Sequence, residues 1–494
     1  MQHCDLTIIE ALDGLNKREF TSKELVQSCL QRIDQVDGEI NAFITVTKEL
    51  ALDQAEEADK LRAQVKNLPL LGIPVGIKDL YCTKGIETTA GSNILKGFIP
   101  PYDATVVKRL KDAGAVIIGK LNQDAFAHGS SGENSDFGIT RNPWNQDYVP
   151  GGSSSGSGAA VSSGMCLAAT GTDTGSSIRL PAAFCNLAGL KNTYGRVSRY
   201  GVIAMASSLD CPGVLTRTVE DQALVLKVIA GHDPLDSTTL ANEVPNYLKS
   251  LRVGSRTVSG RPGKDIRIGI PQEFFVEGIH DKVRELTQQA IERYEKMGFV
   301  IEEISLPHTK YGISTYYILC LSEVSSNLAR YDGIRYLASM RKGDTIEDLY
   351  LDTRGQCFGD EAKRRIMLGT YALSAGYYEA YYDKAQRLRT LVKNDFNEAF
   401  KKVDIILAPS SPTPPFKIGE KVDNPLQMYL SDIYLVTVNL AGVPSLNIPC
   451  GFVNKLPIGM QLIGPQLSEE LLLQVGYTYQ QETDWHERRP NVAY

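Results

Sequence analysis

Two glycine-rich loops near the middle of the chain carry serine hydroxyls in a pattern that could support nucleophilic chemistry. One covers residues 151–158 (GGSSSGSG) and the other covers residues 171–181 (GTDTGSSIRLP). A serine hydroxyl attacks a carbonyl carbon efficiently only when a base takes its proton. The chain must therefore supply a base, for which histidine is the commonest choice.

Histidine-based and phosphate-binding motifs are poorly supported. The chain has six histidines, and none except His128 lies in a catalytic-looking motif. Residues 152–156 match a nucleophile elbow, but the preceding NPWNQD segment is not a strand. Residues 114–120 match a phosphate loop as far as the lysine, yet Leu121 stands where a magnesium-binding Ser or Thr belongs. The absence of paired Cys/His spacing argues against a zinc site, so we expect no metal in this chain.

The two serine loops resemble the pattern of the amidase signature family, in which a Gly-Gly-Ser-Ser loop precedes a Ser-Ile-Arg-x-Pro segment. The serines aligned by this pattern lie 24 positions apart, at 153 and 177. The resemblance implies that Ser177 is the nucleophile and that Ser153, on a cis peptide bond, relays its proton. It also implies that Lys78, in the segment GIPVGIKD, is the base.

This chemistry requires Lys78 to be largely uncharged. Lowering a lysine pKa from about 10.4 to near 7 costs roughly 4 to 5 kcal/mol, which burial at the end of an apolar strand could impose. The alternative is a surface ion pair between Lys78 and Asp79. The presence of both serine loops favours the catalytic interpretation.

The family's oxyanion hole falls on the backbone of Thr174, Gly175, Ser176 and Ser177. A serine replaces the usual glycine at position 176, and a backbone with positive φ there would cost about 1 kcal/mol. The first loop also departs from the pattern, with Ser155-Gly156-Ser157 in place of Gly-Gly-Ser.

Within the family, the resemblance is greatest to the A subunits of glutamyl-tRNA(Gln) amidotransferases and covers nearly the whole chain. Residues 120–135 resemble their substrate-pocket loop, with His128 in place of methionine, and residues 189–201 follow their pattern except for Asn192 in place of proline. The substrate-binding residues implied for glutamine are Arg365 for the α-carboxylate, Asp432 for the α-ammonium, and Tyr316, Gly129 and Ser130 in the pocket lining.

The resemblance implies a heterotrimer with B-type and C-type subunits. Glutamine would be hydrolysed through a glutamyl ester on Ser177, and the ammonia would pass to the B-type partner. That partner, with ATP and Mg, would convert Glu-tRNA(Gln) to Gln-tRNA(Gln), while this chain itself needs no cofactor. Two rivals remain: a stand-alone amidase acting on another small amide, and an inactive scaffold, which Ser176 and Asn192 suggest.

The elements that must position these residues point to an α/β fold. Capping-box spacing at Thr21 and Glu24 predicts a helix over residues 21–36, and a second helix is expected over 47–65. A buried strand should end at Lys78, followed by a helix at 106–113 and a strand at 115–118. Further on we expect strands at 266–271, 299–304 and 405–409, and helices at 282–297 and 371–403. The serine-rich segment 129–213 could be a linker, but its interleaved apolar residues indicate that it packs.

These elements predict one domain over residues 1–494, built on a large mixed, twisted sheet flanked by helices on both sides. Its N-terminal helices would cover about 1–66, the signature core about 67–230, a loop or insertion 232–265, and the C-terminal part 266–494. Clustered Pro and Gly mark the insertion.

Composition limits the function and the compartment. With 43% hydrophobic residues the chain can bury a large core, and its net charge of -6 lacks the basic footprint of independent nucleic-acid binding. Nine scattered cysteines suit a reducing compartment. The first residues do not read as a signal peptide, so we expect a soluble cytoplasmic protein.

Overall fold

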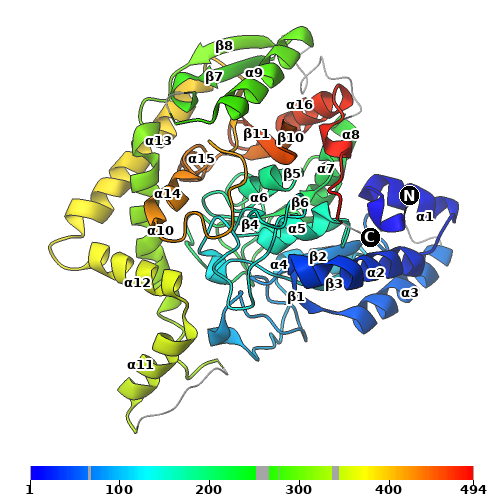
Figure 1. The fold of residues 1–494 in the computed structure, drawn as a ribbon, viewed down its shortest axis with the longest axis horizontal. Coiled ribbons are helices and arrows are strands. Elements are labelled where there is room, and N and C mark those ends of the chain that lie inside the picture. Colours follow the sequence, from blue (N-terminus) through cyan, green and yellow to red (C-terminus); the bar gives the residue numbers. More distant parts are fainter. Residues whose placement is uncertain (1, 65–67, 252–265, 276–277, 337–343, 493–494) are drawn as a thin grey trace.

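The computed structural model describes residues 2–64, 68–251, 266–275, 278–336 and 344–492. Within these ranges the centre of the fold is an 11-stranded sheet with the order β1-β3-β2-β4-β6-β5-β10-β11-β9-β7-β8. In Figure 1 it runs from β1, low in the view, to β8 at the top. The strands are β1 (Phe43–Val46), β2 (Pro74–Lys78), β3 (Val116–Leu121), β4 (Ala168–Asp173), β5 (Ala188–Lys191), β6 (Cys211–Thr216), β7 (Arg267–Pro271), β8 (Val300–Ile304), β9 (Ile405–Pro409), β10 (Ser445–Val453) and β11 (Leu456–Ile463).

The sheet is mixed, as predicted. Strand β2 pairs in parallel with β3 and β4, and β7 pairs in parallel with β8 and β9. The remaining pairs are antiparallel. Every residue of β2 to β6 is buried, which requires cover on both faces of the sheet and explains why most residues of these strands are apolar or small.

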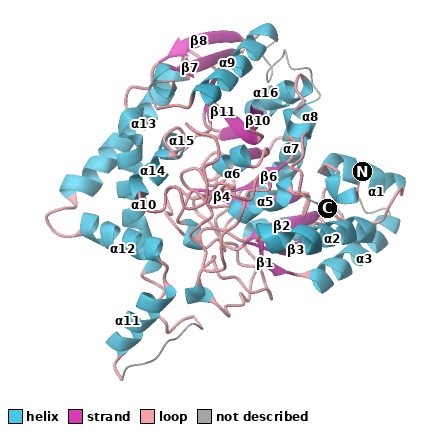
Figure 2. Ribbon diagram, in the orientation of Figure 1, coloured by secondary structure: helices cyan, strands magenta, loops and turns pink. Residues whose placement is uncertain are grey.

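Helices surround this sheet (Figure 2). They are α1 (Ile8–Lys17), α2 (Ser22–Ile40), α3 (Lys48–Ala63), α4 (Thr105–Asp112), α5 (Ser155–Ser162), α6 (Arg179–Phe184), α7 (Val219–Ile229), α8 (Tyr247–Leu251), α9 (Asp281–Lys296), α10 (Gly312–Leu328), α11 (Ile346–Cys357), α12 (Asp360–Leu373), α13 (Lys384–Ala399), α14 (Pro425–Leu430), α15 (Val436–Ala441) and α16 (Glu469–Gln481).

Two neighbouring residues of β10 show that helices cover both faces. Leu446 packs against Gly476 of α16, where a Cβ would lie 2.7 Å from its Cδ2. Asn447 instead lies against Gly459 of β11, which packs on Ala183 of α6. Because successive side chains of a strand point to opposite faces, α16 and α6 lie on opposite sides of the sheet.

The predicted N-terminal helices are present. Thr21 caps α2, accepting a hydrogen bond from the N–H of Glu24, whose carboxylate accepts one from the N–H of Thr21 at 2.8 Å. The helix extends to Ile40, beyond the predicted end at about residue 36, and α3 ends two residues before the predicted 65. Both lie outside the sheet, beside β2 and β3 in Figure 1.

The serine-rich segment is packed, so the linker alternative is wrong. Its described residues form β4, α5, α6, β5 and β6, and all residues of α5 and α6 are buried. Small side chains let α5 lie directly on its neighbours: a Cβ on Gly156 would lie 2.3 Å from the carbonyl oxygen of Ala42. The Gly, Ser and Ala composition therefore reflects close packing.

The prediction of one continuous helix over residues 371–403 is wrong. Helix α12 ends at Leu373, and a turn containing Gly376 (φ +84°) separates it from a π-helical segment at Glu379–Asp383 and from α13. Glycine adopts this left-handed backbone without strain, so the Ser-Ala-Gly sequence interrupts the helix.

The predicted insertion at 232–265 is only partly described, because residues 252–265 lie outside the described ranges. Its first half is fastened to the core. The buried carboxylate of Asp233 accepts hydrogen bonds from Thr105 and Ser198, and Arg196 donates to the carbonyl oxygens of Asn242 and Glu243. This half is therefore not a free surface loop.

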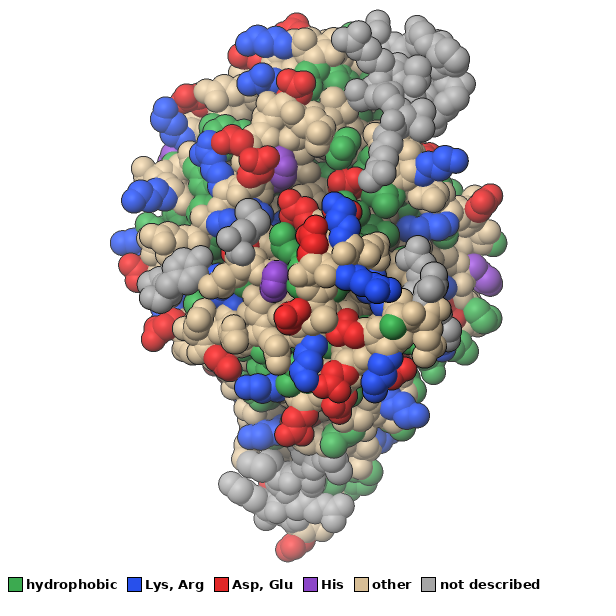
Figure 3. All heavy atoms as spheres, turned by 90° about the vertical axis from the view of Figure 1, so that its right-hand side faces the viewer, with side chains coloured by type: hydrophobic (Ala, Val, Ile, Leu, Met, Phe, Trp, Pro, Cys, Tyr) green, Lys and Arg blue, Asp and Glu red, His purple; other side chains and the backbone are tan. Residues whose placement is uncertain are grey.

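The surface carries no obvious basic region on the face drawn in Figure 3. There, lysine and arginine side chains alternate with aspartate and glutamate over the residues that the structure describes. Among the described helices, none combines the length and the apolar character that crossing a membrane requires.

Candidate active site

Lys78 ends β2 in the interior of the sheet, where its side chain is fully buried. Its Nζ lies 2.8 Å from the hydroxyl oxygen of Ser153, 2.9 Å from that of Ser154 and 2.8 Å from that of Thr172. Thr172 belongs to β4, the parallel neighbour of β2. The strand that carries the amine and the loop that carries Ser153 thus meet inside the protein.

Burial lowers the pKa of Lys78 to about 7, although the carboxylates of Asp124, Asp173 and Asp210 act in the opposite direction. The surface ion pair considered for Lys78 and Asp79 is absent from the described contacts. Asp79 pairs instead with the buried Lys120, 3.0 Å away. The amine of Lys78 is therefore poised between its charged and neutral forms at neutral pH.

The three hydroxyls around Lys78 suit a neutral amine. A neutral amine has two N–H donors and one lone pair, whereas an ammonium group has three donors and no acceptor. Three hydroxyl neighbours can satisfy the neutral form if two accept and one donates. The hydroxyl of Ser153 can therefore give its proton to Lys78, as a proton relay requires.

The Ser153 loop lies against the Ser177 loop. The Gly152–Ser153 peptide bond is cis, as the resemblance implied. The N–H of Ser154 donates to the carbonyl oxygen of Ser177 at 3.3 Å, and the N–H of Gly152 donates to that of Ser130 at 2.9 Å. These bonds bring three segments of the chain together around the lysine.

Asp173 holds the turn that carries Ser177. Its Oδ2 accepts hydrogen bonds from the N–H groups of Ile178 and Arg179, and both its carboxylate oxygens pair with the Arg179 guanidinium at 2.9–3.0 Å. Burial alone would raise the pKa of Asp173, but Arg179 and Asn439 keep it below its usual value. The carboxylate is thus ionised, and it fixes the position of the turn through these hydrogen bonds.

Within this turn, the N–H groups of Gly175, Ser176 and Ser177 donate to no acceptor among the described residues. They are free donors beside a nearly buried hydroxyl, since Ser177 is 5% exposed. Gly175 also lies against Tyr316, because a Cβ on this glycine would be 2.6 Å from the tyrosine hydroxyl oxygen. The arrangement can stabilise an oxyanion formed next to Ser177.

Serine at position 176 introduces no backbone strain. Ser176 is not among the described residues with positive φ, so the cost considered for this substitution does not arise. Its hydroxyl interacts with Asp432 and favours the ionised carboxylate. Asn192 is equally well accommodated, because its side-chain amide donates to the carbonyl oxygen of Pro212 at 2.7 Å.

Asp432 and Ser130 form one side of a buried polar cluster. The hydroxyl of Ser130 donates to Oδ2 of Asp432 at 2.6 Å, and both residues are buried. Burial raises the pKa of Asp432 to about 6, against the effect of Ser130, Ser176 and the charge of Arg365. Gly129, the preceding residue, packs so closely on Asp124 that a Cβ would lie 2.4 Å from its carboxyl carbon.

Arg365 projects from α12 into the same region and is 3% exposed. Its Nε donates to Glu361 at 2.8 Å, and the guanidinium lies 5.7 Å and 5.9 Å from the ring centroids of Tyr317 and Tyr429. The two Nη groups of Arg365 have no acceptor at hydrogen-bonding distance among the described residues. They remain available to a carboxylate ligand.

The geometry brings the predicted residues into one region from seven separate parts of the sequence. Comparison with known proteins agrees, since the Amidase family profile matches residues 24–473. The chain belongs to the amidase family.

Three amidase relatives show how far this likeness extends. The A subunit of the glutamyl-tRNA(Gln) amidotransferase from Chloroflexus aggregans is 53% identical over 489 residues, covering 99% of this chain and 98% of its own. The structure of the corresponding protein from Thermotoga maritima has a TM-score of 0.82 at 38% identity, covering 100% of this chain and 99% of its own. Native peptide amidase from Stenotrophomonas maltophilia gives 0.82 at 30% identity, covering 99% of each chain.

Four residues of this amidase site were not predicted from the sequence: Ser154 and Thr172 beside Lys78, and Glu361 and Tyr429 beside Arg365. Tyr429 donates its hydroxyl hydrogen bond to Oε1 of Glu361 at 3.1 Å. The adjacency of Ser154 to Ser153 was a usable signal. The i, i+4 spacing of Glu361 and Arg365 was another.

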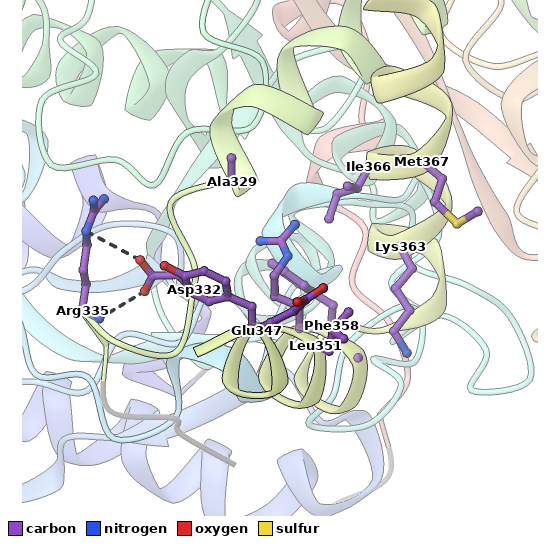
Figure 4. Close-up of a pocket in the computed structure, with 12 residues that line it drawn as sticks. Ala329, Asp332, Arg335, Glu347, Leu351, Phe358, Lys363, Ile366 and Met367 are labelled. Carbon is purple, nitrogen blue, oxygen red and sulfur yellow. Dashed lines mark hydrogen bonds and ion pairs between the residues drawn. The ribbon is translucent and has the colours of Figure 1, made fainter. Parts of the chain in front are cut away.

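A cavity of about 900 Å³ lies on another side of α12, the helix that carries Arg365. It is lined by Lys363, Ile366 and Met367 of α12, by residues of α11 and by the end of α10 (Figure 4). None of the amidase's predicted site residues lines it. The cavity is therefore separate from the lysine and serine cluster.

Proposed function

We propose that this chain is the glutamine-hydrolysing subunit of a glutamyl-tRNA(Gln) amidotransferase. The observation that carries the proposal is the buried Lys78 amine in contact with the Ser153 hydroxyl, beside a turn with free N–H donors at Ser177. The high identity to A subunits along the whole chain supports the choice of substrate.

In the proposed reaction, the Ser177 hydroxyl attacks the side-chain amide carbon of glutamine. Its proton passes to Ser153, which gives its own proton to Lys78. The N–H groups of Gly175, Ser176 and Ser177, with that of Thr174, stabilise the oxyanion. Collapse of the intermediate returns a proton to the leaving nitrogen and releases ammonia. Water then attacks the glutamyl ester while its proton passes through Ser153 to Lys78, and collapse of this second intermediate releases glutamate and returns a proton to the Ser177 oxygen.

Recognition of glutamine follows from its two charged groups. The free Nη groups of Arg365 match a carboxylate, which an arginine fork can bind in two places. Asp432 supplies the negative charge for the α-ammonium, and Ser130, Gly129 and Tyr316 complete the pocket wall. Glu361 and Tyr429 hold the guanidinium in position through its Nε side.

We propose that the chain acts in the cytoplasm within a heterotrimer of A, B and C subunits. The B-type partner would bind ATP, Mg and most of the Glu-tRNA(Gln), in keeping with the net charge of -6 on this chain. We further propose that residues 1–494 form one domain, because one sheet draws strands from both halves of the sequence.

The test is glutamate release from glutamine by the purified chain, alone and with candidate B and C subunits plus Glu-tRNA(Gln). Activity that rises sharply in the complex and is lost in Ser177→Ala supports the proposal. Equal activity without partners points to a stand-alone amidase, and no activity in the assembled complex points to a scaffold.

A further inference from the structure

His128 is a buried polar residue that the proposed reaction does not use. Its side chain is 1% exposed, and neither ring nitrogen has a hydrogen-bond partner among the described residues. Buried polar groups are nearly always paired, because an unpaired one loses its hydration without compensation. An imidazole with two unpaired nitrogens beside a candidate active site therefore calls for a functional explanation.

The backbone around His128 is fixed. Its N–H donates to the carbonyl oxygen of Ala125 at 2.9 Å, and its own carbonyl oxygen accepts from the side chain of Asn134 at 3.0 Å. The ring is tilted against that of Phe126, with centroids 6.2 Å apart. Two residues further along, Ser130 reaches Asp432, so His128 belongs to the loop that forms the pocket wall.

The charge that acts on His128 comes from Arg365. Burial lowers the pKa of the histidine well below its usual value, and the guanidinium of Arg365 lowers it further. The ring is therefore neutral and carries one N–H donor and one acceptor nitrogen. Arg365 has donors only, so it cannot accept the imidazole N–H.

We infer that His128 is an additional substrate-binding residue, whose imidazole N–H donates a hydrogen bond to the α-carboxylate that Arg365 holds. The inference rests on the proposed function and adds a donor to its carboxylate subsite. A carboxylate has about four lone-pair positions. It can therefore accept from the Nη groups of Arg365 and from the imidazole together, which satisfies donors that are otherwise unpaired.

The position is also where this chain departs from the pattern of the A subunits, in which methionine stands in place of His128. Methionine has a similar volume but no N–H donor. The variant His128→Met therefore removes the proposed bond without opening a large cavity. Asparagine and glutamine place an amide N–H near the positions of the two ring nitrogens and serve as conservative replacements.

The experiment measures glutamine binding calorimetrically to the assembled complex in a Ser177→Ala background, which prevents turnover. We expect His128→Met to weaken binding about tenfold or more, the effect of losing a hydrogen bond to a charged group. Either His128→Asn or His128→Gln should recover most of that loss. In complexes with intact Ser177, His128→Met should raise KM and leave kcat nearly unchanged.

Equal affinity of the methionine variant and its parent would overturn the inference, as would failure of both amide variants to recover binding. A fall in kcat without a rise in KM would also overturn it, because a bond to the carboxylate acts on binding. If the Ser177→Ala parent itself binds no glutamine, the proposed function fails. That result is distinguishable from failure of the His128 inference alone.

Discussion

The amine nitrogen of Lys78 lies 2.8 Å from the hydroxyl oxygen of Ser153, although 75 positions separate the two residues in the chain. Neither has appreciable access to solvent. Because charging the lysine in this environment is unfavourable, the pair can exchange a proton near neutral pH.

Removing the lysine should strongly reduce kcat without unfolding the protein. Lys78→Met keeps the length of the side chain and removes the base, and we expect kcat to fall by about 10²–10⁴. The other buried lysine is the control, because Lys120→Met leaves Asp79 buried without its ion-pair partner. That variant should lose about 3–5 kcal/mol of stability in a denaturant titration. Retained activity in Lys78→Met would contradict the proposed base.

The pH profile should report the state of Lys78. With a pKa of about 7, the neutral amine needed for catalysis is lost as the pH falls below 7, so kcat should fall on the acid side. For stability, the folded pKa is depressed relative to the unfolded value of about 10.4. The unfolded chain therefore binds more protons between about pH 7 and 10.4, and this group makes the protein more stable as pH rises through that window.

Lys78→Met removes this proton linkage and provides the control. The difference in unfolding free energy between variant and wild type should shift in favour of the wild type from pH 7 to pH 10. Its total span should be on the order of 5 kcal/mol. A difference that does not change with pH would show that the pKa of Lys78 is not depressed in the folded protein.

Arg365 and Arg364 are neighbours on α12 that both pair with Glu361, which makes them a matched pair. Arg365 is buried and faces the pocket, whereas the Arg364 side chain is 44% exposed. Arg365→Lys loses the fork geometry, and we expect glutamine KM to rise about tenfold to a hundredfold. Arg364→Lys should change it less than about twofold. Unchanged KM in Arg365→Lys would exclude the assigned role.

Gly175 allows the turn at the active site to approach Tyr316. A methyl group at Gly175 would lie 2.6 Å from the tyrosine hydroxyl, so Gly175→Ala must displace the turn or the ring. We expect kcat to fall at least tenfold, because small displacements of oxyanion donors are costly. A methyl group at Gly355 of α11 would meet no atom within 4 Å, and Gly355→Ala should stabilise the helix by about 0.5–1 kcal/mol and leave kcat unchanged.

The sequence predicted much of the fold because the relevant signals are local. The capping box at Thr21, the apolar run ending at Lys78 and the alternation of strands with helices all depend on nearby residues. The helix predicted over 371–403 failed for a local reason as well, since Gly376 interrupts it. The hydrogen bonds that Asp233 accepts from Thr105 and Ser198 could not be predicted in this way, because these partners lie far from Asp233 in the chain.

The sequence by itself determined which residues could do the chemistry, namely a lysine at a strand end and two serines 24 positions apart. Only the tertiary structure decided which groups surround these residues and which pKa the lysine has. Asp79 could have formed a surface ion pair with Lys78. In the folded protein Asp79 instead pairs with Lys120, and Lys78 contacts three hydroxyl groups. A pKa depends on desolvation and on charges contributed by residues distant in the chain, so it is a property of the assembled core and not of the motif.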